Sequence, residues 1–267
     1  MGWRDWAASR LMSNGKAFSA WSLASWFSVL RNIVKDAVLE YDLPRDPCHG
    51  VRGVKKPRAP RATRYLTAQQ VREFLRLVGV HCPQHYAITL ILAVYGLRWE
   101  EASALHTQHL DRETGELRVV QAQVRRKLFP TKNESHKMLP LSDEVIRAVD
   151  GHREMLRVRR NPGLEKGLLF PDVNGDYRLP SSVLKGWTAV SRAMNLAWNV
   201  TPHDLRRSYQ NMLRQASVNL VVQQALMGHS SDAMTMHYSH VEMGEKRAAQ
   251  DKIINLLQFK NAQEQGK

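Results

Sequence analysis

The sequence predicts a mainly helical α+β fold with one small antiparallel sheet. Apolar residues recur at three- and four-residue steps through most of the chain of 267 residues, which is the period of amphipathic helices. Short segments typical of strands occur only between residues 116 and 139. Hydrophobic residues make up 43% of the chain, so a sizeable core can form; a disordered tail, a collagen-like fibre and a coiled coil are excluded.

The N-terminal elements are few. Residues 3–12 fit a short helix, and residues 17–41 fit a longer one, because apolar side chains from Trp21 to Val38 recur at helical spacing. A Ser-Asn-Gly turn separates these two segments. Two or three helices bury little apolar surface by themselves. We therefore expect residues 1–43 to form a small helical domain.

A basic stretch follows at residues 44–64. Prolines and glycines recur through it at a density that prevents both helix and sheet. Seven cations stand against the single acid Asp46, and they are Arg45, Arg52, Lys55, Lys56, Arg58, Arg61 and Arg64. Like charges repel unless a partner neutralises them. We therefore expect an extended linker that binds a polyanion between two domains; a solvated surface loop without a partner is the alternative.

Residues 65–267 are expected to form a second, larger domain. Thr67 and Gln70 have the spacing of a capping box and begin a helix that reaches about Val78, and two more helices are predicted at residues 85–95 and 99–105. Three strands follow, at residues 116–120, 122–129 and 137–139, with a polar turn at residues 131–135. The helical period then returns at residues 142–159, 180–197, 203–215, 220–227, 232–239 and 245–257.

Charge and cysteine content limit the function classes. Lys and Arg number 39 against 25 Asp and Glu, which gives a net charge of +14 and points to a polyanionic partner, most often nucleic acid. Two cysteines are too few for a disulfide framework and favour a reducing compartment. We recognise no signal peptide, and the most apolar stretch, residues 20–30, contains three serines and is too short for a bilayer. We therefore expect a cytoplasmic protein without a membrane segment.

Four segments combine Arg, His, Lys and Tyr. They are Gly-Leu-Arg-Trp-Glu-Glu at residues 96–101, Thr-Lys-Asn-Glu-Ser-His-Lys at 131–137, Pro-His-Asp-Leu-Arg at 202–206, and Gly-His followed by His-Tyr between residues 228 and 238. Each segment alone is weak, since a single Arg is usually a surface cation and a single Tyr is most often half-buried. Their spacing is specific, because His229 follows Arg206 by 23 residues and Tyr238 follows His229 by nine.

In this order the motifs resemble those of the tyrosine recombinases, the phage integrase family, over about residues 13–241. The resemblance implies a DNA strand-transfer enzyme with Tyr238 as nucleophile, Lys132 as general acid, Glu101 as a supporting carboxylate, and Arg98, His203, Arg206 and His229 around the phosphate. Guanidinium forks suit the non-bridging oxygens of a phosphodiester, which explains the two arginines. In the lysine turn, Lys127 and Lys137 are the alternatives to Lys132.

The same resemblance implies the partners. Double-stranded DNA would contact the basic linker through Arg52, Lys55, Lys56, Arg58, Arg61 and Arg64, and the catalytic domain through Arg207. Four copies would assemble from free monomers on paired DNA sites, with accessory DNA-bending or directionality factors, in the bacterial cytoplasm. No metal and no cofactor are implied. A zinc site at His81, Cys82 and His85 is disfavoured because no second pair of ligands has suitable spacing.

The N-terminus departs from the family pattern. Members usually have a core-binding domain of four or five helices, whereas about 43 residues precede the linker here, so we expect either a fragment or a minimal member. Two other functions stay open. One is DNA relaxation in the manner of a type IB topoisomerase, and the other is a non-catalytic DNA-binding regulator, which would have lost the nucleophile or an arginine.

The C-terminal tail carries an apolar stripe within residues 253–259, formed by Ile253, Ile254, Leu256, Leu257 and Phe259. In the family, a helix that follows the nucleophile commonly docks on a neighbouring protomer. We therefore expect this stripe to bind a second copy of the chain. Docking on the chain's own catalytic domain is the alternative.

Overall fold

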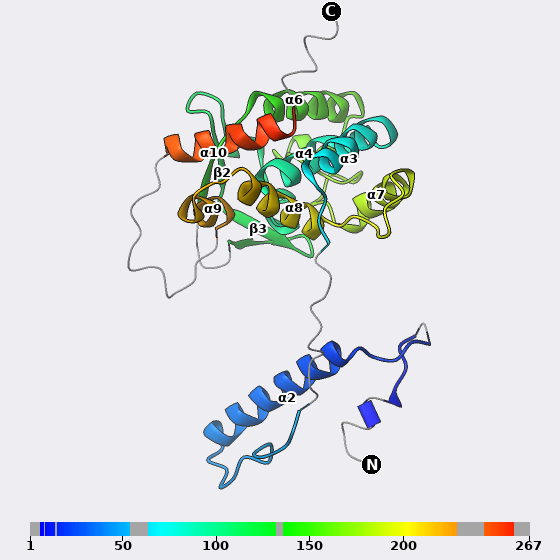
Figure 1. Cartoon of the computed structure of the whole chain (residues 1–267), viewed down its shortest axis with the longest axis vertical. Coiled ribbons are helices and arrows are strands. Elements are labelled where there is room, and N and C mark those ends of the chain that lie inside the picture. The colour runs from blue at the N-terminus through cyan, green and yellow to red at the C-terminus, as the bar shows by residue number, and fades with distance from the viewer. Residues whose placement is uncertain are drawn as a thin grey trace, which may run out of the picture. The chain divides into compact units, whose positions relative to one another are not determined.

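The computed structural model describes residues 6–7, 9–13, 15–53, 64–131, 136–228 and 243–258 (Figure 1). The chain divides into two compact units, Met1–Thr63 and Arg64–Lys267. The division falls within the expected basic linker, of which residues 54–63 lie outside the described residues. Each unit is therefore considered by itself.

One long helix, α2 (Ala20–Glu40), dominates the described part of the N-terminal unit. Ser19 caps it, because its side chain accepts a hydrogen bond from the backbone N–H of Ser22 at 3.1 Å. The helix predicted at residues 3–12 is shorter in the structure, where residues 6, 7 and 9 are the helical ones among those described. Residues 41–53 form turns without helix or strand, as their prolines and glycines predict.

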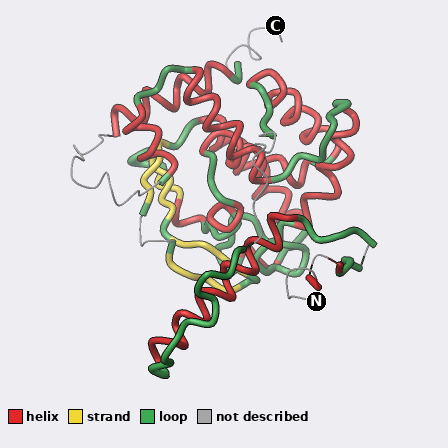
Figure 2. Tube along the Cα trace, turned by 60° about the horizontal axis from the view of Figure 1, so that its bottom comes forward, coloured by secondary structure: helices red, strands yellow, loops and turns green. Residues whose placement is uncertain are grey.

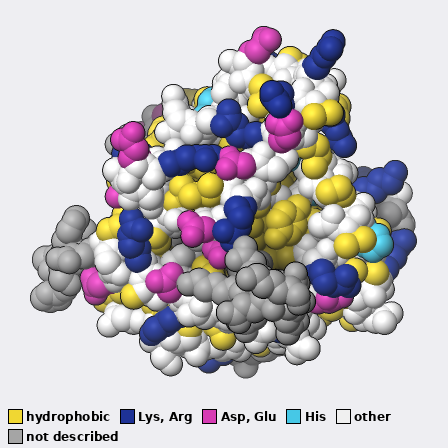
Figure 3. Space-filling view, turned by 90° about the horizontal axis from the view of Figure 1, so that it is seen from above, with side chains coloured by type: hydrophobic (Ala, Val, Ile, Leu, Met, Phe, Trp, Pro, Cys, Tyr) yellow, Lys and Arg dark blue, Asp and Glu magenta, His cyan; other side chains and the backbone are white. Residues whose placement is uncertain are grey.

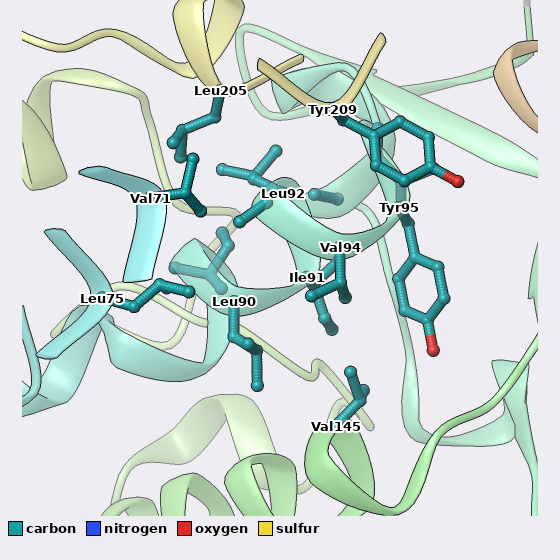
Figure 4. Packing of buried hydrophobic residues seen from close by; sticks show 14 of the residues in the cluster. Val71, Leu75, Leu90, Ile91, Leu92, Val94, Tyr95, Val145, Leu205 and Tyr209 are labelled. Atoms are coloured by element: carbon teal, nitrogen blue, oxygen red, sulfur yellow. The ribbon is translucent and has the colours of Figure 1, made fainter. Parts of the chain in front are cut away.

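Helix α4 (Tyr86–Tyr95) is the centre of the C-terminal unit, and all of its residues except Tyr86 are buried. A helix that is apolar on every side needs partners on every side. The partners are α3 (Ala68–His81), α6 (Asp143–Val158) and α8 (Pro202–Gln215). Figure 4 shows Leu90, Ile91 and Val94 of α4 among Val71 and Leu75 of α3, Val145 of α6 and Leu205 of α8. The predicted capping box of α3 is present, with the Thr67 N–H donating to the Gln70 side chain at 2.9 Å.

The remaining described helices match the predicted segments in order. They are α5 (Trp99–Ala102), α7 (Ser181–Ala193), α9 (Leu220–Met227) and α10 (Met243–Leu256), with 3-10 turns η1 (Pro83–His85), η2 (Thr107–His109) and η4 (Pro162–Leu164). Helix α5 is shorter than the helix predicted at residues 99–105, and the helix predicted at residues 232–239 lies outside the described residues. None of the described helices is long and apolar enough to cross a membrane.

The strands form two antiparallel sheets instead of the one predicted (Figure 2). Strands β1 (Leu110–Asp111), β2 (Glu116–Val119) and β5 (Lys137–Pro140) make the first, and β3 (Gln121–Val124) and β4 (Lys127–Pro130) make a separate hairpin. The single strand predicted at residues 122–129 is therefore wrong. Arg125 and Arg126 turn the chain with φ values of 50° and 68°, and the Gln123 side chain accepts a hydrogen bond from the Arg126 N–H at 3.0 Å. Such turns usually contain Asn or Gly, so two arginines concealed the hairpin.

Helix α10 docks on the chain's own C-terminal unit. Ile253, Ile254 and Leu257 are buried in the main hydrophobic cluster, where α10 contacts β5, α8, α9 and α4. The buried Gln250 side chain donates to the Val94 carbonyl at 2.8 Å and accepts from the Tyr209 hydroxyl at 3.4 Å. The expectation that this stripe binds a second copy is wrong for Ile253, Ile254 and Leu257, which the chain's own unit covers, whereas Leu256 is only partly buried. Phe259 lies outside the described residues.

Charged side chains of both signs share the surface. On the face shown in Figure 3, Lys and Arg lie among Asp and Glu, with hydrophobic side chains between them. Neighbouring pairs form at helical spacing, as between Arg76 and Glu73 at 2.7 Å and between Arg157 and Glu154 at 2.9 Å. The positive charge is therefore not one continuous surface on this face.

The packing of α10 leads to a stability prediction. We expect Ile253→Ala to lower the free energy of unfolding by about 2–5 kcal/mol, because the side chain is fully buried and its loss leaves a cavity. Urea denaturation measures the change. The control is Lys252→Ala, at an exposed position of the same helix, which should change stability by less than about 0.5 kcal/mol. Equal effects of the two substitutions would contradict docking of α10 on its own unit.

Candidate active site

Four of the predicted site residues lie together in the C-terminal unit. Arg98 is the N-cap of α5 and Glu101 lies in that helix, while His203 and Arg206 lie in α8. Arg98, His203 and Arg206 line one cavity of ≈ 320 Å³, together with Glu100, Pro180 and Thr201. Two arginines and an imidazole from separate elements thus face the same small space.

The carboxylate of Glu101 joins the two cations next to it. Its Oε1 accepts hydrogen bonds from Arg98 Nη1 at 2.9 Å and from Lys137 Nζ at 2.7 Å, and its Oε2 accepts from the Arg98 backbone N–H at 2.9 Å. Glu101 and Lys137 are both buried, whereas the Arg98 side chain is 39% exposed. Burial alone would raise the pKa of Glu101, but the Lys137 charge and these hydrogen bonds hold it below its ordinary value. The carboxylate therefore stays ionised and orients Arg98.

Arg206 is held by backbone carbonyls. Its Nη1 donates to the Gly96 carbonyl at 2.6 Å, and its Nη2 donates to the Met227 carbonyl at 3.0 Å. Gly96 lies two residues before Arg98, and Met227 lies two residues before His229. The Arg206 guanidinium therefore holds the start of the Arg98 segment close to the start of the His229 segment.

Two glycines end helices directly before these segments. Gly96 ends α4 with φ 57°, and Gly228 ends α9 with φ 62°. A Cβ on Gly96 would lie 2.3 Å from the Tyr209 ring, and a Cβ on Gly228 would lie 2.2 Å from Lys137 Cε. Both positions require glycine, because a larger residue would displace the buried side chains that order the site.

His203 lies in the first turn of α8, on the solvent side. Thr201 caps this helix and forms a reciprocal pair with Asp204, whose carboxylate accepts from the Thr201 N–H at 3.0 Å. The cap sets where α8 begins and so places His203 beside Arg206. Partial burial and the charges of Arg207 and Arg206 hold the pKa of His203 below its ordinary value.

The site carries an excess of positive charge. Burial and the neighbouring Arg98 lower the pKa of Arg206 to about 10, and burial lowers the pKa of Lys137. Arg206 stays protonated at neutral pH at that value. An anion bound in the cavity would offset the repulsion among these cations, so the arrangement favours a phosphate-sized ligand.

Several predicted residues lie outside the described residues: Lys132, His229, Tyr238, Lys55, Lys56, Arg58 and Arg61. The ends of the segment with His229 and Tyr238 are nevertheless anchored. Met227 is bonded to Arg206, and beyond the segment Lys246 of α10 donates to the Met138 carbonyl of β5 at 3.1 Å. The residues on both sides of the segment are therefore bonded to α8 and β5, the elements that carry Arg206 and Lys137.

The predicted DNA contacts that are described differ in exposure. Arg52 and Arg64 are exposed, in the N-terminal and the C-terminal unit respectively. Arg207 is 39% exposed and lies 3.8 Å from the Asp204 carboxylate. These side chains are accessible, and their contacts with DNA stay predictions.

The structure shows what the sequence patterns missed. Lys137 was an alternative general acid, yet it is buried against Glu101, and its apolar stem covers Gly228. Lys127, the other alternative, is exposed on β4. Tyr209 is fully buried, and burial raises the pKa of its hydroxyl, so it is unsuited to attack DNA. The motif at residues 131–137 contains Lys132 and Lys137, so the sequence did mark Lys137 as a candidate. No local pattern identified Glu101 as its partner.

The residues of the disfavoured zinc motif have other surroundings in the structure. The described residues contain no group of three or more His, Cys, Asp or Glu side chains placed to hold a metal ion. His85, from the disfavoured zinc motif, is hydrogen-bonded to Arg178 at 2.8 Å. Both cysteines are free and buried.

Comparison with known proteins matches most of the chain to one family and to curated relatives. The profile of the phage integrase family matches residues 64–245. Tyrosine recombinase XerC of Escherichia coli O127:H6 is 27% identical over 236 residues, which cover 86% of this chain and 73% of that protein. XerC of Actinobacillus succinogenes is 26% identical over 227 residues, covering 83% and 70% respectively.

Solved structures share the fold. The Tn1549 transposon integrase in complex with circular intermediate DNA superposes with a TM-score of 0.59 at 22% identity, covering 92% of this chain and 82% of that one. A lambda integrase dimer bound to a COC' core site gives a TM-score of 0.59 at 18% identity, covering 84% and 77%. Both resemble this chain in fold.

The buried ion pair leads to a second stability prediction. We expect Lys137→Met to lower the free energy of unfolding by about 3–5 kcal/mol, because Glu101 is left buried beside a single cation. The double variant Lys137→Met with Glu101→Gln should lose less than the sum of the two single variants. Urea denaturation of the parent and the three variants measures this coupling. Strictly additive effects would mean that the pair does not act as a unit.

Proposed function

Because the chain belongs to the phage integrase family, the tyrosine recombinases, we propose that it is a site-specific recombinase that works through a 3′-phosphotyrosyl intermediate. Breakage and rejoining of DNA is the activity of this family's enzymes. For this chain we propose integration or excision of a mobile element, in the bacterial cytoplasm. The observation that carries the proposal is the cavity shared by Arg98, His203 and Arg206.

The first step is attack by Tyr238 on a DNA phosphorus. A P–O bond to the tyrosine oxygen forms, the bond from phosphorus to the 5′ oxygen breaks, and the 3′ end stays attached to the enzyme. A tyrosine hydroxyl has a pKa near 10, so its proton must leave during attack. His203 is suited to accept it, since its lowered pKa keeps the ring neutral.

The transition state carries extra charge on the non-bridging oxygens. Arg98 and Arg206 would bind these oxygens, and His229 would add an imidazole N–H. Glu101 already holds Arg98, and backbone carbonyls already hold Arg206, so both guanidinium groups are oriented before DNA arrives. Donors that need no reorganisation stabilise a transition state more than mobile ones do.

The leaving 5′ oxygen needs a proton, and we assign this role to Lys132. Lys137 is a poor alternative because its ammonium group is bound to Glu101 in a buried pair. Rejoining is the reverse reaction: a 5′ hydroxyl attacks the phosphotyrosyl phosphorus, and the tyrosine leaves as it regains a proton. The bonds formed and broken balance without a co-reactant.

Assembly is part of the proposal. We propose that the basic residues of the linker follow DNA phosphates between a partial core-binding domain and the catalytic domain. We also propose that four copies bind paired DNA sites, aided by accessory DNA-bending or directionality factors. Since Ile253, Ile254 and Leu257 of the α10 stripe are buried in their own unit, we propose that contacts between copies use other surfaces.

The nucleophile provides the decisive test. Tyr238→Phe should bind a nicked attachment-site duplex as the parent does but form no covalent adduct, because only the attacking oxygen is removed. A denaturing gel measures the adduct. The control Tyr209→Phe should retain it, because that hydroxyl is buried. An adduct on the Tyr238 variant would disprove the assignment, and supercoil relaxation by the parent without Holliday-junction formation would favour the topoisomerase alternative.

The general acid has a chemical test. We expect Lys132→Ala to cleave ordinary DNA at least 100-fold more slowly than the parent, which is the low end of the usual contribution of a general acid. A substrate with sulfur at the bridging 5′ position should be cleaved at nearly the parental rate, since a thiolate leaves without a proton. Single-turnover rates on the two substrates measure the rescue. Equal slowing on both substrates would assign Lys132 another role, and Lys127→Ala is the control.

A further inference from the structure

A larger cavity of ≈ 670 Å³ shares no lining residue with the candidate active site. Four arginines line it: Arg126 from the β3–β4 turn, Arg159 and Arg160 after α6, and Arg178 before α7. Asp172 is the only carboxylate among the described residues that line it. The cavity is therefore strongly cationic.

Asp172 is already engaged by other groups. One of its oxygens accepts from Arg126 Nη2 at 2.6 Å, and the other accepts from the backbone N–H groups of Asn174 at 2.9 Å and Asp176 at 3.0 Å. Arg126 also contacts the Asp176 carboxylate at 3.2 Å. These bonds hold the β3–β4 turn against the turn at residues 172–176. Among the described residues, no carboxylate is hydrogen-bonded to the other three arginines, Arg159, Arg160 and Arg178.

Arg178 is the buried member of the set, with 7% of its surface exposed. Its Nε and Nη2 donate to the Pro171 carbonyl at 3.2 and 2.6 Å, and its Nη1 bonds to His85 Nδ1 at 2.8 Å. Both partners are uncharged, since burial and Arg178 lower the pKa of His85 to about 4. Asp172 attracts Arg178 without a hydrogen bond to it, yet burial and Arg159 still lower the pKa of Arg178, so a bound anion would offset the remaining desolvation cost.

His152 gives an independent sign of an absent ligand. It lines the same cavity and is buried, and neither of its ring nitrogens has a hydrogen-bond partner among the described residues. A buried donor without a partner is unfavourable, so a ligand or ordered water belongs beside it.

Helix capping does not account for the arginines. Arg159 and Arg160 follow the C-terminus of α6, where cations are favoured, but the helix dipole there amounts to only about half a charge. Arg178 comes from a different segment and lies at the same cavity. Arg159, Arg160 and Arg178 together carry more positive charge than is needed to balance the dipole of α6.

We propose that this cavity binds a phosphate group, with Arg178 as the inner ligand and Arg159 and Arg160 as the outer ligands. The volume lies in the usual range of small-molecule sites. Planar guanidinium forks bind both carboxylate and phosphate oxygens in pairs, but a phosphate offers more negative charge and more oxygens than a carboxylate, which suits three arginines around one space. The phosphate belongs either to a free nucleotide or to the DNA backbone. The proposal does not depend on recombination activity.

The test uses Arg159→Gln with Arg160→Gln in the whole chain of 267 residues, at exposed positions where folding is retained. The control is Arg153→Gln with Arg157→Gln, which removes the same charge from α6 outside the cavity. Inorganic phosphate and adenosine monophosphate are titrated at constant ionic strength, with the His152 ring signals followed by NMR. A 30-base-pair duplex without a recombination site is titrated at several salt concentrations.

Two results support the proposal and identify the source. If the phosphate is free, the cavity variant binds phosphate or nucleotide at least tenfold more weakly than the control, in line with the loss of charged hydrogen bonds. If it belongs to DNA, the salt dependence of duplex binding falls by about one to two phosphate contacts in the cavity variant relative to the control. If the two variants behave alike in every titration, the proposal is wrong. None of these outcomes tests Tyr238 or strand cleavage.

Discussion

Glu101 is the group on which the order of the candidate active site depends. It is a buried carboxylate that contacts Arg98 through both backbone and side chain and also binds Lys137 from β5. Without it, Arg98 would lose its orientation and Lys137 would be a buried cation without this partner. The same carboxylate therefore stabilises the fold locally and orients the Arg98 guanidinium at the candidate active site, which links packing directly to the arrangement of the site.

The site is rigid because it is built at the ends of packed helices. Helix α4 is buried on all sides and ends at Gly96, directly before the Arg98 segment. Helix α8 lies against α4 and carries Arg206, whose guanidinium bonds back to the Gly96 carbonyl. Helix α10 adds Gln250, which bonds to the Val94 carbonyl near the end of α4. The hydrophobic core thus determines where the polar groups meet.

Local patterns in the sequence predicted most of the described helices and the capping box at Thr67, because these depend on neighbours a few positions apart. The order and spacing of the motifs singled out Arg98, Glu101, His203 and Arg206, which the structure brings together. Features that depend on distant partners were missed. The turn at Arg125 and Arg126 relies on the buried Gln123 side chain, and the docking of α10 relies on apolar surface from four other elements. Periodicity shows that a stripe is apolar but does not show which surface covers it.

Among the described residues of the C-terminal unit, positive charge is buried at Lys137, Arg206 and Arg178, and burial lowers the pKa of each. Lys137 is hydrogen-bonded to a carboxylate, whereas Arg178 is hydrogen-bonded to two neutral groups, the Pro171 carbonyl and the His85 ring. A cation with neutral partners lowers the stability of the free protein, but an anion that binds only the folded state recovers stability in proportion to its affinity. Burial of Arg206 at the candidate active-site cavity and of Arg178 at the second cavity follows the same logic: each cationic cavity would be stabilised by a ligand of opposite charge.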